Sequence, residues 1–150
     1  MRFTNSNLFH PMAIATLFLA NMVAAARADS ITITDAWIRA LPTSVPSGGY
    51  FTLHNAGDKT VTLVGAESPA CGMLMLHKST DMGGMTSMRD VAAVEVPAGT
   101  SVKFKPGGYH LMCMGAKPAI KPGLKIPVML TFKDGSKVTT EFAVRNAAGK

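Results

Sequence analysis

The amino-acid sequence predicts an all-β protein, built as an antiparallel Greek-key β-sandwich or a small Greek-key barrel. Short segments that alternate apolar and polar residues follow one another, and Gly, Pro, Asn or Asp residues separate them at short intervals. No long stretch has the period of an amphipathic helix, because Pro or Gly interrupts every candidate. About eight or nine short strands at this spacing are typical of sandwiches and small barrels.

The first part of the chain contains four extended segments, residues 30–34, 36–39, 50–54 and 60–64, of which the second continues directly from the first and counts with it as one strand. In the first of them, Ile31 and Ile33 lie on one face because side chains alternate along a strand. A loop rich in Pro, Ser and Gly over residues 42–49 separates the second segment from the third.

The second part supplies six more segments: residues 74–77, 91–96, 101–104, 109–114, 126–132 and 137–144. The stretch that follows residues 74–77 contains Asp81, Gly83 and Gly84, and we expect it to be flexible. The last two segments are expected to form a hairpin around Asp134-Gly135, a dipeptide typical of tight β-turns.

The first 28 residues are predicted to be a cleaved signal peptide. Arg2 precedes an apolar run over residues 12–26, and Ala26-Arg27-Ala28 has the small-x-small form of a cleavage site. Cleavage before Asp29 leaves residues 29–150 as a single domain, although the preceding Ala-Ala-Ala run is an alternative site. No second apolar stretch approaches the length of a membrane span, so we expect an exported, soluble, monomeric protein.

The charge pattern argues against a nucleic-acid-binding protein, and the motif content argues against an enzyme. Residues 29–150 carry 13 basic and 9 acidic side chains, a net charge of +4 with neutral histidines, and the lysines are scattered. This pattern indicates a solubilising surface rather than a nucleic-acid site, and a mild attraction for an acidic protein partner. No Ser-His-Asp set, phosphate-binding glycine loop or carboxylate pair is recognisable, so the protein is not expected to be an enzyme.

Methionine and histidine are concentrated in one stretch, residues 73–114. It holds seven of the eight methionines beyond the predicted leader, and it ends in His110-Leu111-Met112-Cys113-Met114. Because side chains alternate along a strand, His110 and Met112 project side by side. Imidazole nitrogen beside thioether sulfur suits Cu(I), whereas Mg²⁺ and Ca²⁺ require oxygen and zinc prefers thiolate, imidazole or carboxylate.

Four of these residues recur with a defined spacing. Ten residues separate His77 from Met88, twenty-one separate Met88 from His110, and Met112 lies two positions further on. This pattern, with the sequence around Trp37 and the Pro-Gly-Gly-Tyr that precedes His110, resembles the periplasmic copper chaperone family called PCuAC.

The resemblance implies a cupredoxin-like β-sandwich in the periplasm that binds one Cu(I) through His77, Met88, His110 and Met112. It also implies delivery of Cu(I) to a copper-accepting protein, either the copper-A centre in subunit II of cytochrome c oxidase or a Sco-type thioredoxin-like protein. Binding of Cu(II) is left open. The same ligands would also suit copper sequestration. A cupredoxin-type electron carrier is a further alternative, but such sites place a cysteine before the histidine and methionine of the ligand loop.

Two further pairs of residues are candidates for roles at or near the copper. Met82 and Met85 form a methionine-rich run with Met88, and they are either accessory copper contacts or exposed residues of a mobile loop. Cys71 and Cys113 are the only cysteines, and an even number in an exported protein favours a disulfide. Free thiols and a redox-dependent extra copper ligand are the alternatives.

Overall fold

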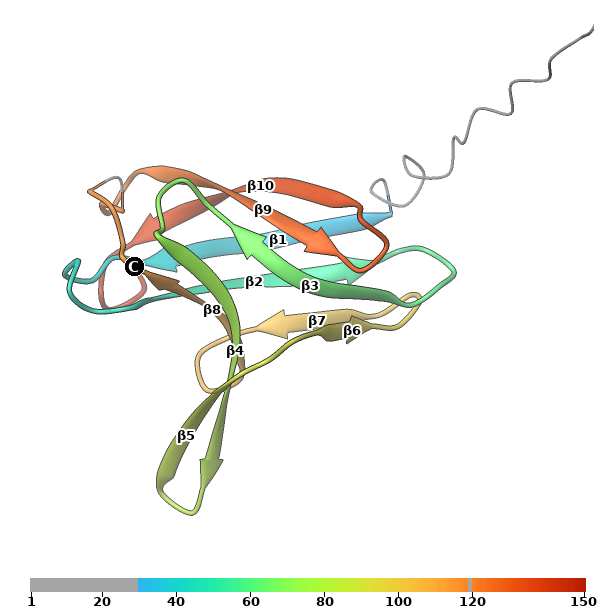
Figure 1. Cartoon of the computed structure of the whole chain (residues 1–150), viewed down its shortest axis with the longest axis horizontal. Coiled ribbons are helices and arrows are strands. Elements are labelled where there is room, and N and C mark those ends of the chain that lie inside the picture. Colours follow the sequence, from blue (N-terminus) through green and yellow to red (C-terminus); the bar gives the residue numbers. More distant parts are fainter. Residues whose placement is uncertain (1–29, 119) are drawn as a thin grey trace, which may run out of the picture.

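The structure is a computed structural model that describes residues 30–118 and 120–150 (Figure 1). The predicted signal peptide, residues 1–28, lies outside the described residues. Within the described ranges all the regular structure is β, and no helix is long and apolar enough to cross a membrane. The strands are β1 (Ile31–Arg39), β2 (Ser47–Asn55), β3 (Val61–Glu67), β4 (Met73–Met82), β5 (Met85–Asp90), β6 (Val94–Val96), β7 (Ser101–Phe104), β8 (Tyr109–Met114), β9 (Lys125–Phe132) and β10 (Lys137–Arg145).

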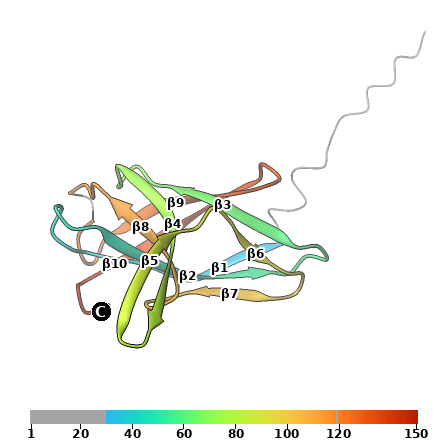
Figure 2. The same ribbon diagram turned by 60° about the horizontal axis from the view of Figure 1, so that its bottom comes forward.

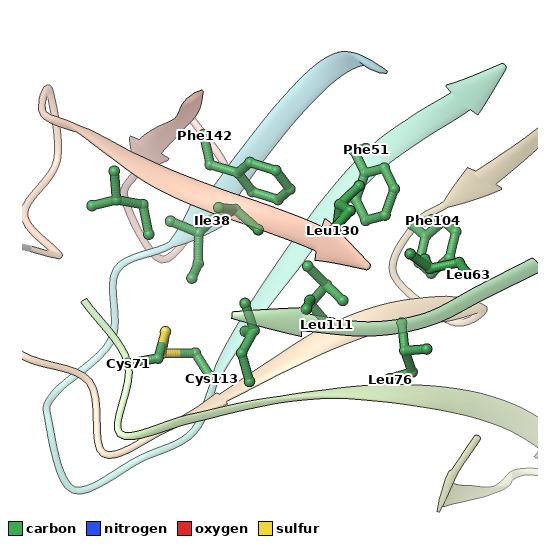
Figure 3. Close-up of a cluster of buried hydrophobic side chains, with 14 of the residues drawn as sticks. Ile38, Phe51, Leu63, Cys71, Leu76, Phe104, Leu111, Cys113, Leu130 and Phe142 are labelled. Carbon is green, nitrogen blue, oxygen red and sulfur yellow. A yellow bond between two sulfur atoms is a disulfide. The ribbon is translucent and has the colours of Figure 1, made fainter. Parts of the chain in front are cut away.

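The strands pair in the order β5-β4-β8-β2-β1-β10-β9-β3-β6, and β7 pairs with the second half of β2. Every pair in this path is antiparallel except β1 with β10. The sheet folds over so that side chains from β1, β2, β9 and β10 face those from β3, β4 and β8 across one core (Figure 3). The predicted all-β, cupredoxin-like sandwich is therefore confirmed.

The core is apolar and aromatic. Phe51, Phe104 and Phe142 are almost fully buried, and the rings of Phe51 and Phe104 stack with centroids 4.2 Å apart. Leu76 on β4 and Leu111 on β8 pack into the same cluster. These two leucines anchor the core face of the two strands whose opposite face carries the predicted metal ligands.

A β-bulge changes the direction of the side chains in β1. The register with β2 shifts between Thr34 and Trp37, and Asp35 has a φ of 52°, a left-handed conformation that such bulges favour. Ile31 and Ile33 face the core before the bulge, whereas Ile38 faces it afterwards. The bulge therefore turns Trp37 away from the core and towards the site described below.

The segment predicted to be flexible is instead a β-hairpin, so that expectation was wrong. β4 continues to Met82, and β5 returns along it from Met85 after a two-residue turn. Gly83 and Gly84 both have positive φ, 65° and 91°, as a tight hairpin turn requires. All of β5 is exposed, so it lacks the alternation that identifies a half-buried strand, and the hairpin extends away from the body (Figures 1 and 2).

A disulfide joins Cys71, just before β4, to Cys113 in β8. Cys113 points into the core while its neighbour Met112 lies on the opposite face. The disulfide thus fixes the end of β8 to the start of β4, and it contains both cysteines of the chain.

Replacing both cysteines by alanine should lower the free energy of unfolding. The bond spans 42 residues, and the chain-entropy model assigns a loop of that size about 4 kcal/mol. Urea denaturation of the Cys71→Ala/Cys113→Ala protein measures the loss, with reductant-treated wild type as the matched control. A double variant as stable as the oxidised wild type would contradict this role.

Candidate metal centre

Strand register brings the four predicted ligands to one face of β5-β4-β8. His77 lies opposite His110, and Met75 lies opposite Met112. On the other side of β4, Ser79 lies opposite Met88. Directly paired residues share a face, and so do residues two apart along a strand, so both histidines, Met88 and Met112 all project from the same surface.

The two histidines form a close cross-strand pair. Their ring centroids are 5.7 Å apart and their planes meet at 68°. His110 is only 4% exposed, and the side chain of His77 is 13% exposed. Both imidazoles are therefore largely removed from water, although they lie on the face of the strands opposite the core.

His77 is buried with its hydrogen-bonding capacity unused. Its Nε2 lies 2.9 Å from Oδ1 of Asp90, but the contact lacks the geometry of a hydrogen bond. Neither ring nitrogen has a hydrogen-bond partner among the described residues. A buried polar group without a hydrogen bond costs about 1–3 kcal/mol, so this imidazole, whose charged neighbour is the exposed Asp90, is suited to binding a further partner such as a metal ion.

His110 is held in one tautomer. Its Nδ1 lies 3.0 Å from the carbonyl oxygen of Gly108, and because a carbonyl only accepts, Nδ1 must donate. In the neutral ring the lone pair is then on Nε2, free to bind a metal. Burial lowers the pKa of His110 below its usual 6.5; the bond to Gly108 opposes this shift, and the nearby His77 adds to it. The ring is thus held in the neutral form that metal binding needs.

The thioethers lie nearer to solvent than the imidazoles. Met88, Met112 and His110 line one surface pocket, while His77 lies beside it against His110. Met88 is 52% exposed and Met112 is half-buried. The site is therefore buried at its histidine end and open at the methionine on the projecting hairpin.

Aromatic and cationic side chains form the wall beside His110. Tyr50 lies 6.4 Å from His110 and 4.6 Å from Trp37, measured between ring centroids. The guanidinium of Arg39 lies 5.7 Å from the Trp37 ring and 5.8 Å from the Tyr50 ring, and Arg39 lines the same pocket as the thioethers. A fixed positive charge beside the site disfavours a divalent ion more than a monovalent one.

Gly48 makes room for this wall. It lies on β2 opposite Met112, and a Cβ there would come within 2.4 Å of the Tyr50 hydroxyl oxygen. In the sequence, the residues around Trp37 indicate only the family resemblance. The roles of Arg39 and Tyr50 depend on the bulge in β1 and on the β2–β8 register, neither of which sequence spacing reveals.

The two accessory candidates lie elsewhere on the hairpin. Met82 pairs with Met85 at the tip of the hairpin. The side chains of this pair project from the opposite face of the hairpin to those of Ser79 and Met88, which are paired three positions away. Met82 and Met85 are 70% and 76% exposed. The register therefore directs Met82 and Met85 away from the face that carries Met88.

The donor set suits a soft ion of low charge. Among the described residues no group of three His, Cys, Asp or Glu side chains is placed to hold a metal. Two imidazoles with two thioethers form a donor set that suits Cu(I) or its analogue Ag(I), whereas Mg²⁺ and Ca²⁺ require several oxygen ligands.

Comparisons with known proteins show the family and the fold of the chain. The family model described as "Putative lipoprotein LpqE-like" matches residues 31–144. The chain is 32% identical to "Putative lipoprotein Lxx21020" of Leifsonia xyli subsp. xyli over 124 residues, which cover 82% of this chain and 74% of the relative.

Solved structures with the same fold include copper-binding proteins. The solution structure of CuI-DR1885 from Deinococcus radiodurans is 31% identical, with a TM-score of 0.62 over 81% of this chain and 85% of that one. The copper-bound PCuAC domain from PmoF2 is 22% identical, with a TM-score of 0.64 over 78% of this chain and 93% of that one, and shares the fold. The resemblance drawn from the ligand spacing is therefore confirmed: the chain belongs to the LpqE-like family and has the cupredoxin-like fold of PCuAC domains.

Proposed function

We propose that this protein is a periplasmic copper chaperone that binds one Cu(I) through His77, Met88, His110 and Met112. The observation that carries the proposal is the His77 ring, which lies opposite His110, has buried nitrogens that make no hydrogen bond, and meets the exposed carboxylate of Asp90 at 2.9 Å. A metal ion bound to this ring would supply a coordination bond in place of the missing hydrogen bond. The relative DR1885, which has been solved with Cu(I), supports the choice of ion.

The proposed route is export followed by transfer. Residues 1–28 would direct the chain to the periplasm, and residues 29–150 would act there as a monomer. The acceptor we propose is the copper-A centre in subunit II of cytochrome c oxidase, reached directly or through a Sco-type thioredoxin-like protein. Met88 is the most exposed of the four ligands, so an incoming acceptor would displace it first and the buried imidazoles last.

The arrangement favours carriage of Cu(I) over electron transfer. A blue-copper site needs a cysteine thiolate, and both cysteines of this chain form the disulfide. Thioethers, unlike thiolates, are not lost to disulfides in an oxidising compartment. Arg39 beside the pocket disfavours Cu(II), so any Cu(II) binding should be weaker than Cu(I) binding.

The first test is a competition titration with Cu(I) against a chromogenic chelator. Wild type should bind one ion tightly, and His110→Ala or Met112→Ala should each weaken that site by more than the roughly 10–100-fold typical of losing an outer-shell partner. Met129→Leu, a change in β9 far along the sheet from the ligands, is the matched control. Equal affinity in all four proteins would refute the proposed site.

Transfer is tested separately from binding. The Cu(I)-loaded protein is mixed with the soluble copper-A domain of an oxidase subunit II, and the acceptor is followed by its visible absorption after oxidation. Sequestration rather than delivery would leave the copper on this protein although the acceptor binds it more tightly at equilibrium.

Titration of His110 should make the Cu(I) affinity depend on pH, because a protonated imidazole cannot bind a metal, whereas thioethers bind no protons. Since the pKa of His110 is lowered from 6.5, its proton begins to compete only below that pH. We therefore expect a constant affinity from pH 8 to pH 7 and a progressive fall below about pH 6.5. Chelator competition across this range measures the profile, and a steady fall between pH 8 and pH 7 would contradict it.

A further inference from the structure

Four methionines share the ligand face of β4 and β8, but the proposed site uses only one of them. Met73 lies opposite Met114, and Met75 lies opposite Met112, in the two pairs that follow His77–His110 along the strands. These four residues are called the methionine ladder. It runs from the histidine pair to the end of the two strands beside the disulfide.

Within residues 73–77 of β4 and 110–114 of β8, the two faces of the strands differ in residue type. The core face carries Leu74, Leu76, Leu111 and Cys113, all buried, while every residue of the ladder is on the other face. Leucine and methionine have similar volumes and usually replace each other at small cost. Apolar bulk alone would therefore not confine methionine to one face, whereas a need for sulfur would.

The outer rung of the ladder is open to solvent. Met73 is 56% exposed and Met114 is 39% exposed, although methionine is ordinarily among the more buried residue types. Met75 and Met112 are half-buried beneath them. Thioether side chains thus occupy both pairs of the ladder, from the solvent-exposed outer pair to the pair that contains Met112, the last ligand of the proposed site.

The spacing allows several thioethers to reach one ion. Paired residues on adjacent antiparallel strands have Cβ atoms about 4.5–5.5 Å apart, and rungs two residues apart are separated by roughly 7 Å. Methionine has three flexible torsions, so its sulfur can cover such distances. Met73, Met75 and Met114 can therefore supply three neutral sulfur donors around one position.

We infer that Met73, Met75 and Met114 form a second, weaker Cu(I) site that exchanges its ion with the first site through Met112. The inference rests on the proposed function, since it takes the His77–His110 centre as the tighter site. Three thioethers without an imidazole should hold Cu(I) more loosely and remain accessible. This end of the strands would then be a loading or unloading route, separate from the β4–β5 hairpin.

The test is an anaerobic Cu(I) titration of the purified exported protein, followed by NMR of the methionine methyl groups and histidine rings. The first equivalent should shift His77, His110, Met88 and Met112. The second should shift Met73, Met75 and Met114 and leave Met82, Met85 and Met129 in place. Met73→Leu/Met114→Leu should weaken only the second equivalent, by about tenfold or more, a loss of about 1.4 kcal/mol.

The matched control is Met82→Leu/Met85→Leu. It removes two methionines that are more exposed than those of the outer rung but lie at the hairpin tip, so both equivalents should bind as in wild type. Loss of the second equivalent in this control, or an unchanged second equivalent in Met73→Leu/Met114→Leu, would overturn the inference.

The two proposals fail in different ways. A single bound ion that shifts the histidines, with no response from the outer rung at any Cu(I) concentration, would overturn the second site and leave the proposed function intact. Shifts of Met73, Met75 and Met114 without any response from His77 and His110 would overturn the proposed function and leave the sulfur site.

Discussion

Because a strand sends successive side chains to opposite faces, the pairing of β4 with β8 decides at once which residues enter the core and which face the candidate metal. The sequences Met-Leu-Met-Leu-His in β4 and His-Leu-Met-Cys-Met in β8 run antiparallel, and their register sets His77 against His110. A slip of one residue would turn every thioether and imidazole of one strand into the core and expose its leucines. The burial of Leu76 and Leu111 therefore favours the register that places the candidate ligands on the opposite face.

Other features of the fold support that register from both sides. The disulfide ties Cys113 to the start of β4, so β8 cannot slide without breaking it. On the far side of β8, Gly48 of β2 faces Met112 and leaves space for Tyr50. The bulge at Asp35 brings Trp37 onto Tyr50, and Arg39 covers both rings. Residues that are distant in sequence thus build one rigid wall against which the buried imidazoles are held.

Much of this arrangement could be predicted from the sequence because it depends on period-two alternation. Alternation predicted the common face of Ile31 and Ile33 and the side-by-side projection of His110 and Met112, and the turn dipeptide Asp134-Gly135 predicted the β9–β10 hairpin. The β4–β5 hairpin was missed because all of β5 is exposed and has no alternation to detect, although Gly83-Gly84 was a turn signal. Met82 and Met85 illustrate the same difficulty. Their spacing to Met88 suggested a common role, but facing in a hairpin is set by pairing across the turn, which linear spacing does not reveal.

A copper carrier must hold its ion during transport and still release it to an acceptor. Neutral imidazoles and thioethers bring no negative charge, so they hold a monovalent ion by donor softness rather than by charge neutralisation, and the positive Arg39 nearby strengthens the bias against a divalent ion. The ring nitrogens of His77 are buried without a hydrogen bond, so binding an ion there would offset part of the cost of their burial. In the proposed site, half-exposed Met88 would be the ligand that an acceptor displaces. Affinity would then depend on the β4–β8 pair and accessibility on the projecting hairpin, so the two properties could vary independently.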